Sequence, residues 1–377
     1  MNTKNNNNIS VNFNCLRPIV GLINRDDENE PKQIKVAGRQ RIYVSPQCTK
    51  FNLLKFLGIR TMEKFSDKNF DQLKNMIINY DDEKDKYKYI QISKKEFDKI
   101  ADLLANNGKA KTKKKKSTNS DDCDDTTETQ EKGKSGDTAM KLSLKALNIF
   151  YNSDNKSKEN LEELCLKNIA LGTFLTGAMF TKKGGDTVVY NSLISMYPGI
   201  SIGEADFVND FGTCQSDMER SGAITLFDTN PSAYILHYGC ALDCSGMVDV
   251  LVNNFEYDRD RAVNEVANFV ALLYKALRKF NYSAKESYFG YQEVGRVHFT
   301  ITNAQPVSFF SKAFQKQYNE KDKTTEDASE FLAEIMDEYY KKEWENNMDD
   351  DIIKYECFHD TVSKDTIESV VKNFLKQ

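Results

Sequence analysis

The chain has 377 residues, of which 40% are hydrophobic and 29% are charged. This length suits one large domain or two ordinary ones, and the composition is globular rather than disordered. The sequence contains no apolar run long enough for a transmembrane helix, and its polar start predicts no signal peptide. Eight unevenly spaced cysteines do not form a secreted disulfide framework, so we expect a cytoplasmic protein with reduced thiols.

The net charge of −5 is distributed unevenly. Residues 319–377 hold 17 acidic and 8 basic side chains, whereas Pro31–Arg60 contain no acidic residue at all. The basic residues of this second stretch, here called the basic segment, are Lys32, Lys35, Arg39, Arg41, Lys50, Lys55 and Arg60. In an acidic protein such a segment is a candidate anion-binding surface. The alternative is an ordinary solvated face.

The first sixty residues predict two strands and a helix. A polar lead-in of ten residues precedes Pro18–Ile23, which suits a strand, and Arg41–Val44 suits a second strand. Ser45 and Pro46 are typical of a helix start, with serine as the cap and proline at the first helical position. Gly58 predicts the end of this helix. Its expected apolar stripe is Phe51, Leu54 and Leu57.

Two mostly helical regions follow, at residues 60–105 and 138–180. Between them, residues 106–137 carry a lysine-rich block and then an acidic block, with no apolar pattern. We expect a disordered, solvated insertion here, with contact to nucleic acid as the alternative.

The second half of the sequence mixes strand and helix patterns. Thr187–Tyr197 and Ala233–Leu242 resemble strands, and Asp260–Phe280 is the clearest amphipathic helix. Arg296–Thr302 alternates polar and apolar residues, which predicts a half-buried strand. Residues 325–377 predict acidic helices. Without a strict β–α alternation, we expect an α+β fold with an antiparallel sheet.

Most catalytic signatures are absent, including a P-loop, HExxH and GxSxG. His237, Cys240 and Cys244 form a partial set of zinc ligands, but buried cysteine packing in a strand explains them better. The adjacent carboxylates of Asp26 and Asp27 fit either a metal-dependent nuclease or, preferably, a capped turn. We therefore expect no catalytic residue, metal or cofactor.

The basic segment carries the stronger functional signal. The start of a helix offers backbone N–H groups and the positive end of the helix dipole. Arg39, Arg41, Ser45, Gln47 and Lys50 gather around this start, with Gln47 and Lys50 on one helical face. Such a group suits contact with phosphates, which positions a nucleic acid without reading its sequence.

These residues also resemble a known family. The runs that carry the resemblance are Ile23–Asp27, Pro31–Lys32, Gly38–Lys50, Gly177–Met179, Tyr190–Pro198, Ala205–Asp210, Pro306–Phe309 and Ala313–Phe314. They are similar to CasC, the repeated backbone subunit of type I-E CRISPR Cascade complexes in the RAMP superfamily. The likeness covers about residues 11–318. It departs from the family pattern at Pro46 and at Phe51–Leu54, where relatives carry further polar and basic residues.

The resemblance implies a hand-shaped α+β protein. Its palm would be a modified RRM-like, or ferredoxin-like, antiparallel sheet with helical fingers inserted and a β-hairpin thumb. The ranges implied are 1–60, 166–198 and 225–318 for the palm, 61–165 for the fingers, 199–224 for the thumb, and 319–377 for acidic C-terminal helices.

The resemblance also implies a function without catalysis. Several copies would bind along one crRNA, together with other Cascade subunits, and present the guide to target DNA. The residues it assigns to RNA binding are Asn24, Arg25, Lys32, Arg39, Arg41, Ser45, Gln47, Lys50, Lys55, Met179 and Phe207. Phe207 would unstack one base, with Met179 packing from the opposite loop; core packing is the alternative for both.

Two other functions remain open at this point. A type III-like backbone subunit would cleave target RNA with a metal ion and Asp26 or Asp27. A stand-alone RNA-binding protein would never assemble along a guide.

Overall fold

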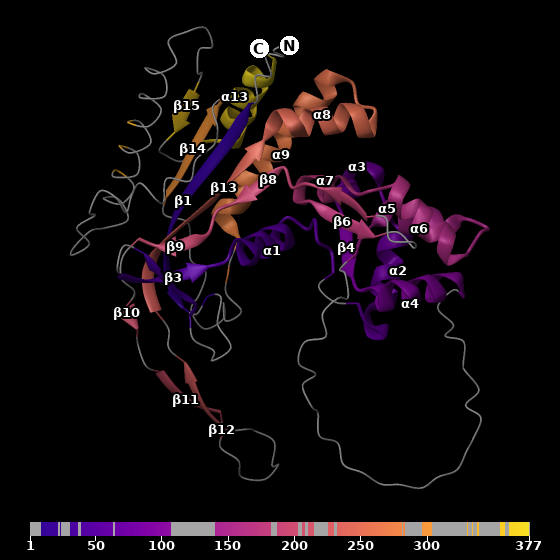
Figure 1. Ribbon diagram of the computed structural model, residues 1–377, viewed down its shortest axis with the longest axis horizontal. Coiled ribbons are helices and arrows are strands. Elements are labelled where there is room, and N and C mark those ends of the chain that lie inside the picture. Colours follow the sequence, from indigo (N-terminus) through magenta and orange to yellow (C-terminus); the bar gives the residue numbers. More distant parts are fainter. Residues whose placement is uncertain are drawn as a thin grey trace. The chain divides into compact units, whose positions relative to one another are not determined.

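The computed structural model describes residues 9–21, 23, 31–36, 39–62, 65–106, 140–181, 187–202, 206–207, 210–214, 225–229, 232–280, 282, 296–303, 330, 334, 338, 355–358 and 362–376. The chain divides into two compact units (Figure 1). Unit 1 contains Met1–Leu57 and Leu193–Gln377, and unit 2 is the continuous stretch Gly58–Ser192. The helical insertion implied by the sequence, 61–165, lies within unit 2, as do most of residues 166–198. The charged insertion, from residue 107 onward, lies outside the described residues.

Nine antiparallel strands form the main sheet among the described residues of unit 1. Their order is β15–β14–β1–β13–β9–β3–β2, and β8 and β10 also pair with β13. The bounds are β1 Ser10–Gly21, β2 Gln33–Val36, β3 Arg39–Val44, β8 Ile194–Met196, β9 Gly199–Ser201, β10 Asp206–Phe207, β13 Ser232–Asp243, β14 Arg296–Thr302 and β15 Tyr355–Phe358. The expected mixture of helices with an antiparallel sheet is therefore confirmed.

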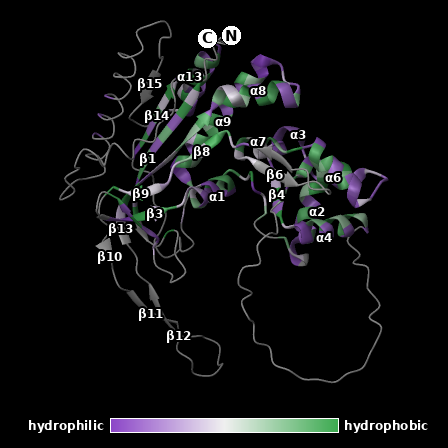
Figure 2. Cartoon of the chain, in the orientation of Figure 1, coloured by the Kyte–Doolittle hydropathy of each residue, from purple (hydrophilic) through white to green (hydrophobic). Residues whose placement is uncertain are grey.

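Strand β1 lies inside this sheet, between β14 and β13. Phe13 is opposite Cys240 of β13 on one side and Phe299 of β14 on the other. Hydrophobic and polar residues alternate along the strand (Figure 2), and the side chains of Val11, Phe13 and Cys15 are fully buried. The strand begins at Ser10, well before the expected Pro18, because residues 10–16 pair with two strands that are distant in sequence.

Helices cover the apolar face of the sheet. They are α8 Cys244–Phe255, α9 Arg259–Lys279 and α13 Lys364–Lys376. The ring of Tyr274 in α9 lies 5.9 Å from that of Phe13, and its hydroxyl accepts a hydrogen bond from Val362 N–H, just before α13. The prediction of a helix over Asp260–Phe280 is confirmed to within one residue at each end. The C-terminal range is not wholly helical, because β15 pairs with the edge of β14.

The prediction of a half-buried β14 is wrong. His298, Thr300 and Thr302 are as fully buried as the apolar residues of the other face. The register places His298 opposite Asn14 and Thr300 opposite Asn12. A buried polar face is tolerated when its groups find hydrogen-bonding partners, and β1 supplies polar neighbours along this row.

Unit 2 is mainly helical, as expected, but it also contains short strands. Its elements are η1 Asp67–Asn69, α2 Phe70–Ile78, α3 Asp82–Asp85, β4 Tyr89–Ile92, α4 Lys94–Ala105, β5 Met140–Ser143, α5 Leu144–Asn152, α6 Lys158–Lys167, α7 Leu171–Thr176, β6 Ala178–Thr181 and β7 Thr187–Tyr190. Strands β4 and β5 pair with each other, as do β6 and β7. Fully buried Leu73, Phe97, Leu147 and Phe150 belong to one core cluster, so this unit has a hydrophobic core of its own.

A separate hairpin follows the main-sheet strands β9 and β10. It consists of β11 Asp210–Cys214 and β12 Thr225–Thr229, paired from Asp210 with Thr229 to Cys214 with Thr225. The hairpin expected at 199–224 thus begins later, because Gly199–Ser201 is already part of the main sheet. Among the residues described here, no helix is both long and apolar enough to cross a bilayer.

Candidate nucleic-acid interface

The basic segment folds as a hairpin followed directly by a helix. Strands β2 and β3 pair from Gln33 with Ile42 to Val36 with Arg39. Tyr43 N–H donates to Lys32 O at 2.7 Å, which holds the start of the hairpin beside its end. Helix α1, Pro46–Phe56, follows β3 after a single residue. Exposed Lys32 therefore lies close to the beginning of α1.

The start of α1 confirms the sequence prediction. Ser45 is the cap, and its hydroxyl accepts a hydrogen bond from Cys48 N–H at 3.2 Å. Gly58 follows the helix with a φ of 66°, a conformation that favours glycine. Pro46 has no N–H and the cap uses that of Cys48. The first turn consequently offers fewer amide donors to a phosphate than the sequence pattern suggests.

The inward side of α1 differs from the expected stripe. Thr49, Leu53 and Leu54 are buried, whereas Phe51 is only half-buried. The hydroxyl of Thr49 forms a hydrogen bond of 2.8 Å with that of Tyr282. Because Thr49 faces the core, the helix turns Phe51 partly toward solvent.

Tyr282 belongs to an aromatic cage around a buried cation. The guanidinium carbon of Arg17 lies 5.5, 4.9 and 5.9 Å from the ring centroids of Tyr238, Phe280 and Tyr282, within the range of cation–π attraction. Its Nη1 donates to Phe280 O at 2.6 Å and its Nη2 to Leu277 O at 3.2 Å. These carbonyls lie at the end of α9, where the negative end of the helix dipole favours a cation. This cage, called the Arg17 cage below, links α9 to α1.

Arg41 does not occupy the surface position that phosphate contact requires. Its side chain is 3% exposed. The guanidinium donates to Ser201 O at 3.2 Å and also to Ile202 O. These carbonyls lie where β9 ends, and the guanidinium supplies them with hydrogen-bond donors. The Arg41 guanidinium therefore joins β3 to the end of β9, and its contact with RNA stays a prediction.

The remaining cations near α1 differ in environment. Lys32 and Lys55 are exposed, as is Gln47, whereas Lys50 is half-buried. Burial lowers the pKa of Lys50 to about 8, and nearby Cys240 acts in the opposite direction. Burial raises the pKa of the Cys48 thiol, and the positive charge of nearby Lys32 acts in the opposite direction.

Several predicted contacts are only partly described. Asn24 and Arg25 lie outside the described residues, as do Asp26 and Asp27. Arg39 is opposite Val36 in the hairpin, and its side chain is not described. Phe207, the predicted wedge, belongs to unit 1, whereas Met179, predicted to pack from the opposite loop, belongs to unit 2. Met179 of β6 is opposite Val189, and Phe207 of β10 is opposite Ser232; neither side chain is described.

The spacing of His237, Cys240 and Cys244 does not bring the three side chains together. His237 and Cys240 are three residues apart in β13, so they point to opposite faces of the sheet. His237 Nε2 lies 3.0 Å from Asn14 Oδ1 on the polar face. Cys240 shares the apolar face with Phe13, its partner in β1.

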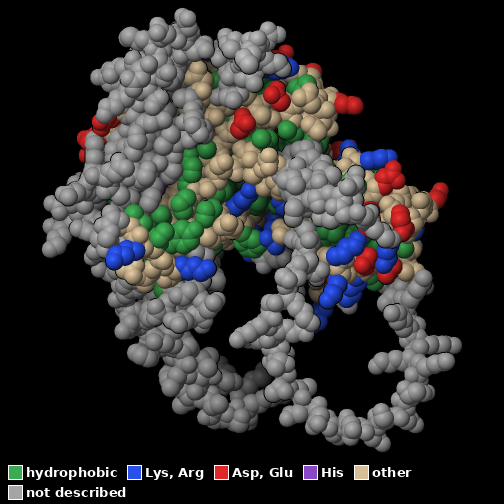
Figure 3. Space-filling model, in the orientation of Figure 1, with side chains coloured by type: hydrophobic (Ala, Val, Ile, Leu, Met, Phe, Trp, Pro, Cys, Tyr) green, Lys and Arg blue, Asp and Glu red, His purple; other side chains and the backbone are tan. Residues whose placement is uncertain are grey.

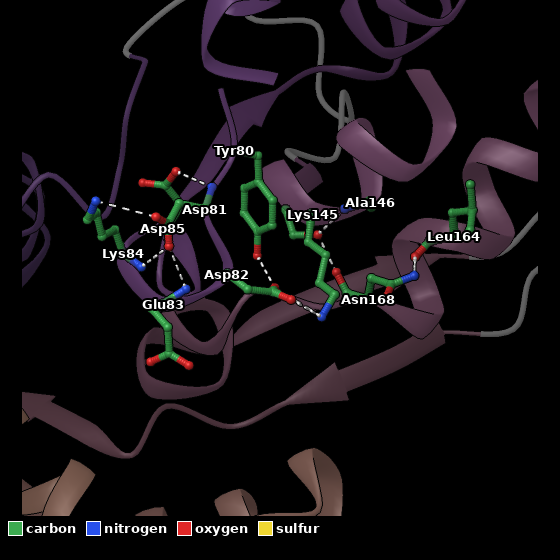
Figure 4. Close-up of polar contacts among 11 residues, drawn as sticks. Tyr80, Asp81, Asp82, Glu83, Lys84, Asp85, Lys145, Ala146, Leu164 and Asn168 are labelled. Carbon is green, nitrogen blue, oxygen red and sulfur yellow. Dashed lines mark hydrogen bonds and ion pairs between the residues drawn. The ribbon is translucent and has the colours of Figure 1, made fainter. Parts of the chain in front are cut away.

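The carboxylates of a cluster in unit 2 form hydrogen bonds and ion pairs with neighbouring groups (Figure 4). Asp81 caps α3, and its own N–H donates to Asp85 Oδ2 at 3.0 Å. Asp82 accepts from Tyr80 OH at 2.8 Å and pairs with Lys145 at 3.1 Å. The bond from Tyr80 is the main cause of a lowered pKa at Asp82. In the part of the chain that the structure describes, no group of acids, histidines or cysteines could hold a metal ion.

Sequence reasoning missed two features of α1. The Arg17 cage requires residues far apart in sequence, so no local pattern indicates it. Phe56, in contrast, carries a local signal. It is the last residue of the helix, next to Lys55, and it is 49% exposed. An aromatic residue at the end of a basic helix, next to a lysine, is the pattern that would have identified it.

Solved structures resemble this chain over nearly its whole length. A chain described as "CRISPR RNA-guided surveillance complex, pre-nicking" is 16% identical, with a TM-score of 0.60. The alignment covers 97% of this chain and 100% of that chain. A second, "CRISPR RNA-guided surveillance complex", is 14% identical with a TM-score of 0.49, and 97% and 98% of the two chains are covered. A search of curated proteins finds no match.

The first of these structures shows a shared fold. The sequence profile of the CT1975-like protein family, a Cas family, matches residues 11–372. The resemblance to a Cascade-type CRISPR protein inferred from the sequence is thereby confirmed. Because the match spans nearly the entire chain, this protein belongs to the CT1975-like protein family.

Proposed function

We propose that this protein is a non-catalytic, crRNA-binding backbone subunit of a cytoplasmic Cascade complex. Several copies bind along one guide RNA with the other subunits and present the guide for pairing with target DNA. The observation that carries the proposal is the acid-free basic segment, folded as β2, β3 and α1 with exposed Lys32, Lys35 and Lys55. Basic side chains hold phosphates whatever the bases are, which suits a guide of variable sequence.

The parts of the hand follow from the same proposal. The nine-stranded sheet of unit 1 serves as the palm, unit 2 as the fingers, and the β11–β12 hairpin as the thumb. Phe207 lies just before this hairpin, so it keeps its proposed role of unstacking a base. The likeness to a chain of a CRISPR surveillance complex supports this assignment through the fold.

Replacing Lys32 and Lys55 together by alanine should weaken RNA binding equally for guides of unrelated sequence. Each lost phosphate contact to single-stranded RNA lowers the slope of log affinity against log salt by about 0.7. The double variant should therefore lose about 1.4 in slope. Fluorescence anisotropy with two short labelled RNAs, at several salt concentrations, measures both quantities.

A matched control removes two lysines of unit 2 that lie outside the basic segment. Lys84 and Lys167 are 81% and 68% exposed, and each pairs with a nearby acid. Their double alanine variant should keep the wild-type slope. An unchanged slope in the Lys32/Lys55 variant would place the RNA elsewhere. Metal-dependent cleavage of target RNA that disappears on Asp26→Ala or Asp27→Ala would favour the type III-like enzyme, and a monomer on a long RNA would favour the stand-alone binder.

RNA affinity should also fall as the pH rises from 7 to 9. The Lys50 pKa of about 8 means that its ammonium loses its proton in this interval, whereas an ordinary lysine stays charged. If Lys50 contacts a phosphate, the loss approaches about tenfold, because only the charged form binds well. Lys50→Arg keeps its charge and should give a flat profile. A wild-type profile that is equally flat removes Lys50 from the RNA path.

A further inference from the structure

The last residue of α1 is an exposed aromatic residue in a basic setting. Buried Thr49, Leu53 and Leu54 define the inward side of the helix. Since an α-helix advances about 100° per residue, Lys55 lies opposite them, whereas Phe56, seven residues after Thr49, lies on their side at the last position of the helix. Both are exposed. Over the place that α1 occupies in Figure 1, Figure 3 shows Lys or Arg side chains next to hydrophobic ones.

Phe56 stands out among the exposed hydrophobic residues. Within the described part of the chain, the large hydrophobic side chains on the surface are Ile34, Phe56, Ile78 and Leu272, with exposures of 38%, 49%, 48% and 41%. Phe56 is the most exposed of the four and the one with an aromatic ring. It is also in the stretch that has seven basic residues and no acidic one. A flat apolar ring beside a cation matches a nucleotide, which presents a flat base beside a phosphate.

We propose that Phe56 stacks on an unpaired base of bound single-stranded RNA, while Lys55 holds an adjacent phosphate. This inference rests on the function proposed above and adds a contact to it. An aromatic ring stacks on every base, so it strengthens binding without selecting a guide sequence. A protein partner fits less well, because lysine is depleted from the cores of protein interfaces and Phe56 stands beside Lys55.

The two residues predict different salt responses, which separates stacking from charge. Phe56→Ala should weaken binding of a mixed-sequence single-stranded RNA about tenfold or more, with an unchanged salt slope. Lys55→Ala should lower the slope by about 0.7. Phe56→Leu keeps an apolar side chain without a ring and should be as weak as Phe56→Ala. Phe56→Tyr should bind like the wild type.

A spectroscopic test reports the stack directly. Trp344 is the single tryptophan of the chain, so Trp344→Phe provides a silent background. In that background, full-length protein with Phe56→Trp should lose tryptophan fluorescence when RNA is added, because a stacked base quenches the indole. Ile78→Trp is the matched control, since Ile78 is 48% exposed on α2 of unit 2. Its fluorescence should not respond.

The outcomes distinguish this inference from the proposed function. If the wild type binds RNA and Phe56→Ala binds equally well, the stacking contact is wrong and the function stands. If the wild type binds no RNA, both are wrong. If Phe56→Ala keeps its RNA affinity but loses self-association, Phe56 is a contact between protein subunits and the inference is overturned.

Discussion

Replacing Arg17 by alanine should lower the free energy of unfolding of unit 1 by about 3–5 kcal/mol. The side chain is fully buried, and the change removes a guanidinium that contacts three aromatic rings and two carbonyls. It leaves the carbonyls of Leu277 and Phe280 without these donors and opens a cavity beneath α1. Both effects destabilise a folded core. Urea unfolding monitored by circular dichroism measures the loss.

Two further variants separate charge from shape at this position. Arg17→Lys keeps the charge but loses the planar group that donates to two carbonyls, so it should remain clearly destabilised. Arg17→Met keeps an unbranched apolar side chain in the cage without a buried charge and should be the mildest of the three. If Arg17→Ala unfolds at the wild-type urea concentration, the Arg17 cage does not stabilise unit 1.

Acid should destabilise the protein through His237. This side chain is 1% exposed, and its burial lowers the pKa to about 4 from the usual 6.5. Between these values the unfolded state binds more protons than the folded state. Stability is therefore retained above pH 6.5 and lost as the pH falls toward 4, by about 3 kcal/mol from this group.

The variant His237→Gln isolates this contribution. Glutamine does not titrate, and its amide can donate to Asn14 as an imidazole N–H does. Carboxylates elsewhere titrate in both proteins, so the difference between the two stability profiles belongs to His237. Urea unfolding at several pH values between 7 and 4 gives those profiles. Parallel profiles would show that His237 takes up its proton in the folded state as easily as in the unfolded state.

The elements predicted best are those whose signals are local and strong. Ser45, Pro46 and Gly58 predict both ends of α1, and the long apolar period of α9 predicts that helix almost to the residue. Four-residue strands such as Tyr89–Ile92 are too short to show a clear period, so β4 and β5 were missed. Thr187–Tyr197 reads as one strand, but β7 pairs within unit 2 and β8 pairs with β13. Pairing between strands that are far apart in the sequence decides where such strands begin and end.

In the candidate site, too, the predictions agree with the structure where the signal is local and fail where distant residues decide. Exposed Lys32, Gln47 and Lys55 agree with a basic surface inferred from charge alone. Arg41 does not, because its burial depends on carbonyls at the end of β9, which lies some 160 residues away in the sequence. Phe51 was expected in the core for its apolar character. The buried place belongs to Thr49, whose hydroxyl bonds to that of Tyr282, a residue far away in the sequence.

The position of β1 between β14 and β13 separates the folding of the two units in time during synthesis. β1 is made first, but its neighbours β13 and β14 begin only at Ser232 and Arg296. At about 5–20 residues per second, on the order of 15–60 s pass on the ribosome between the start of β1 and that of β14. Unit 2 is continuous and ends at Ser192, before either partner exists. All residues of its core are therefore synthesised before β1 can pair with either neighbouring strand.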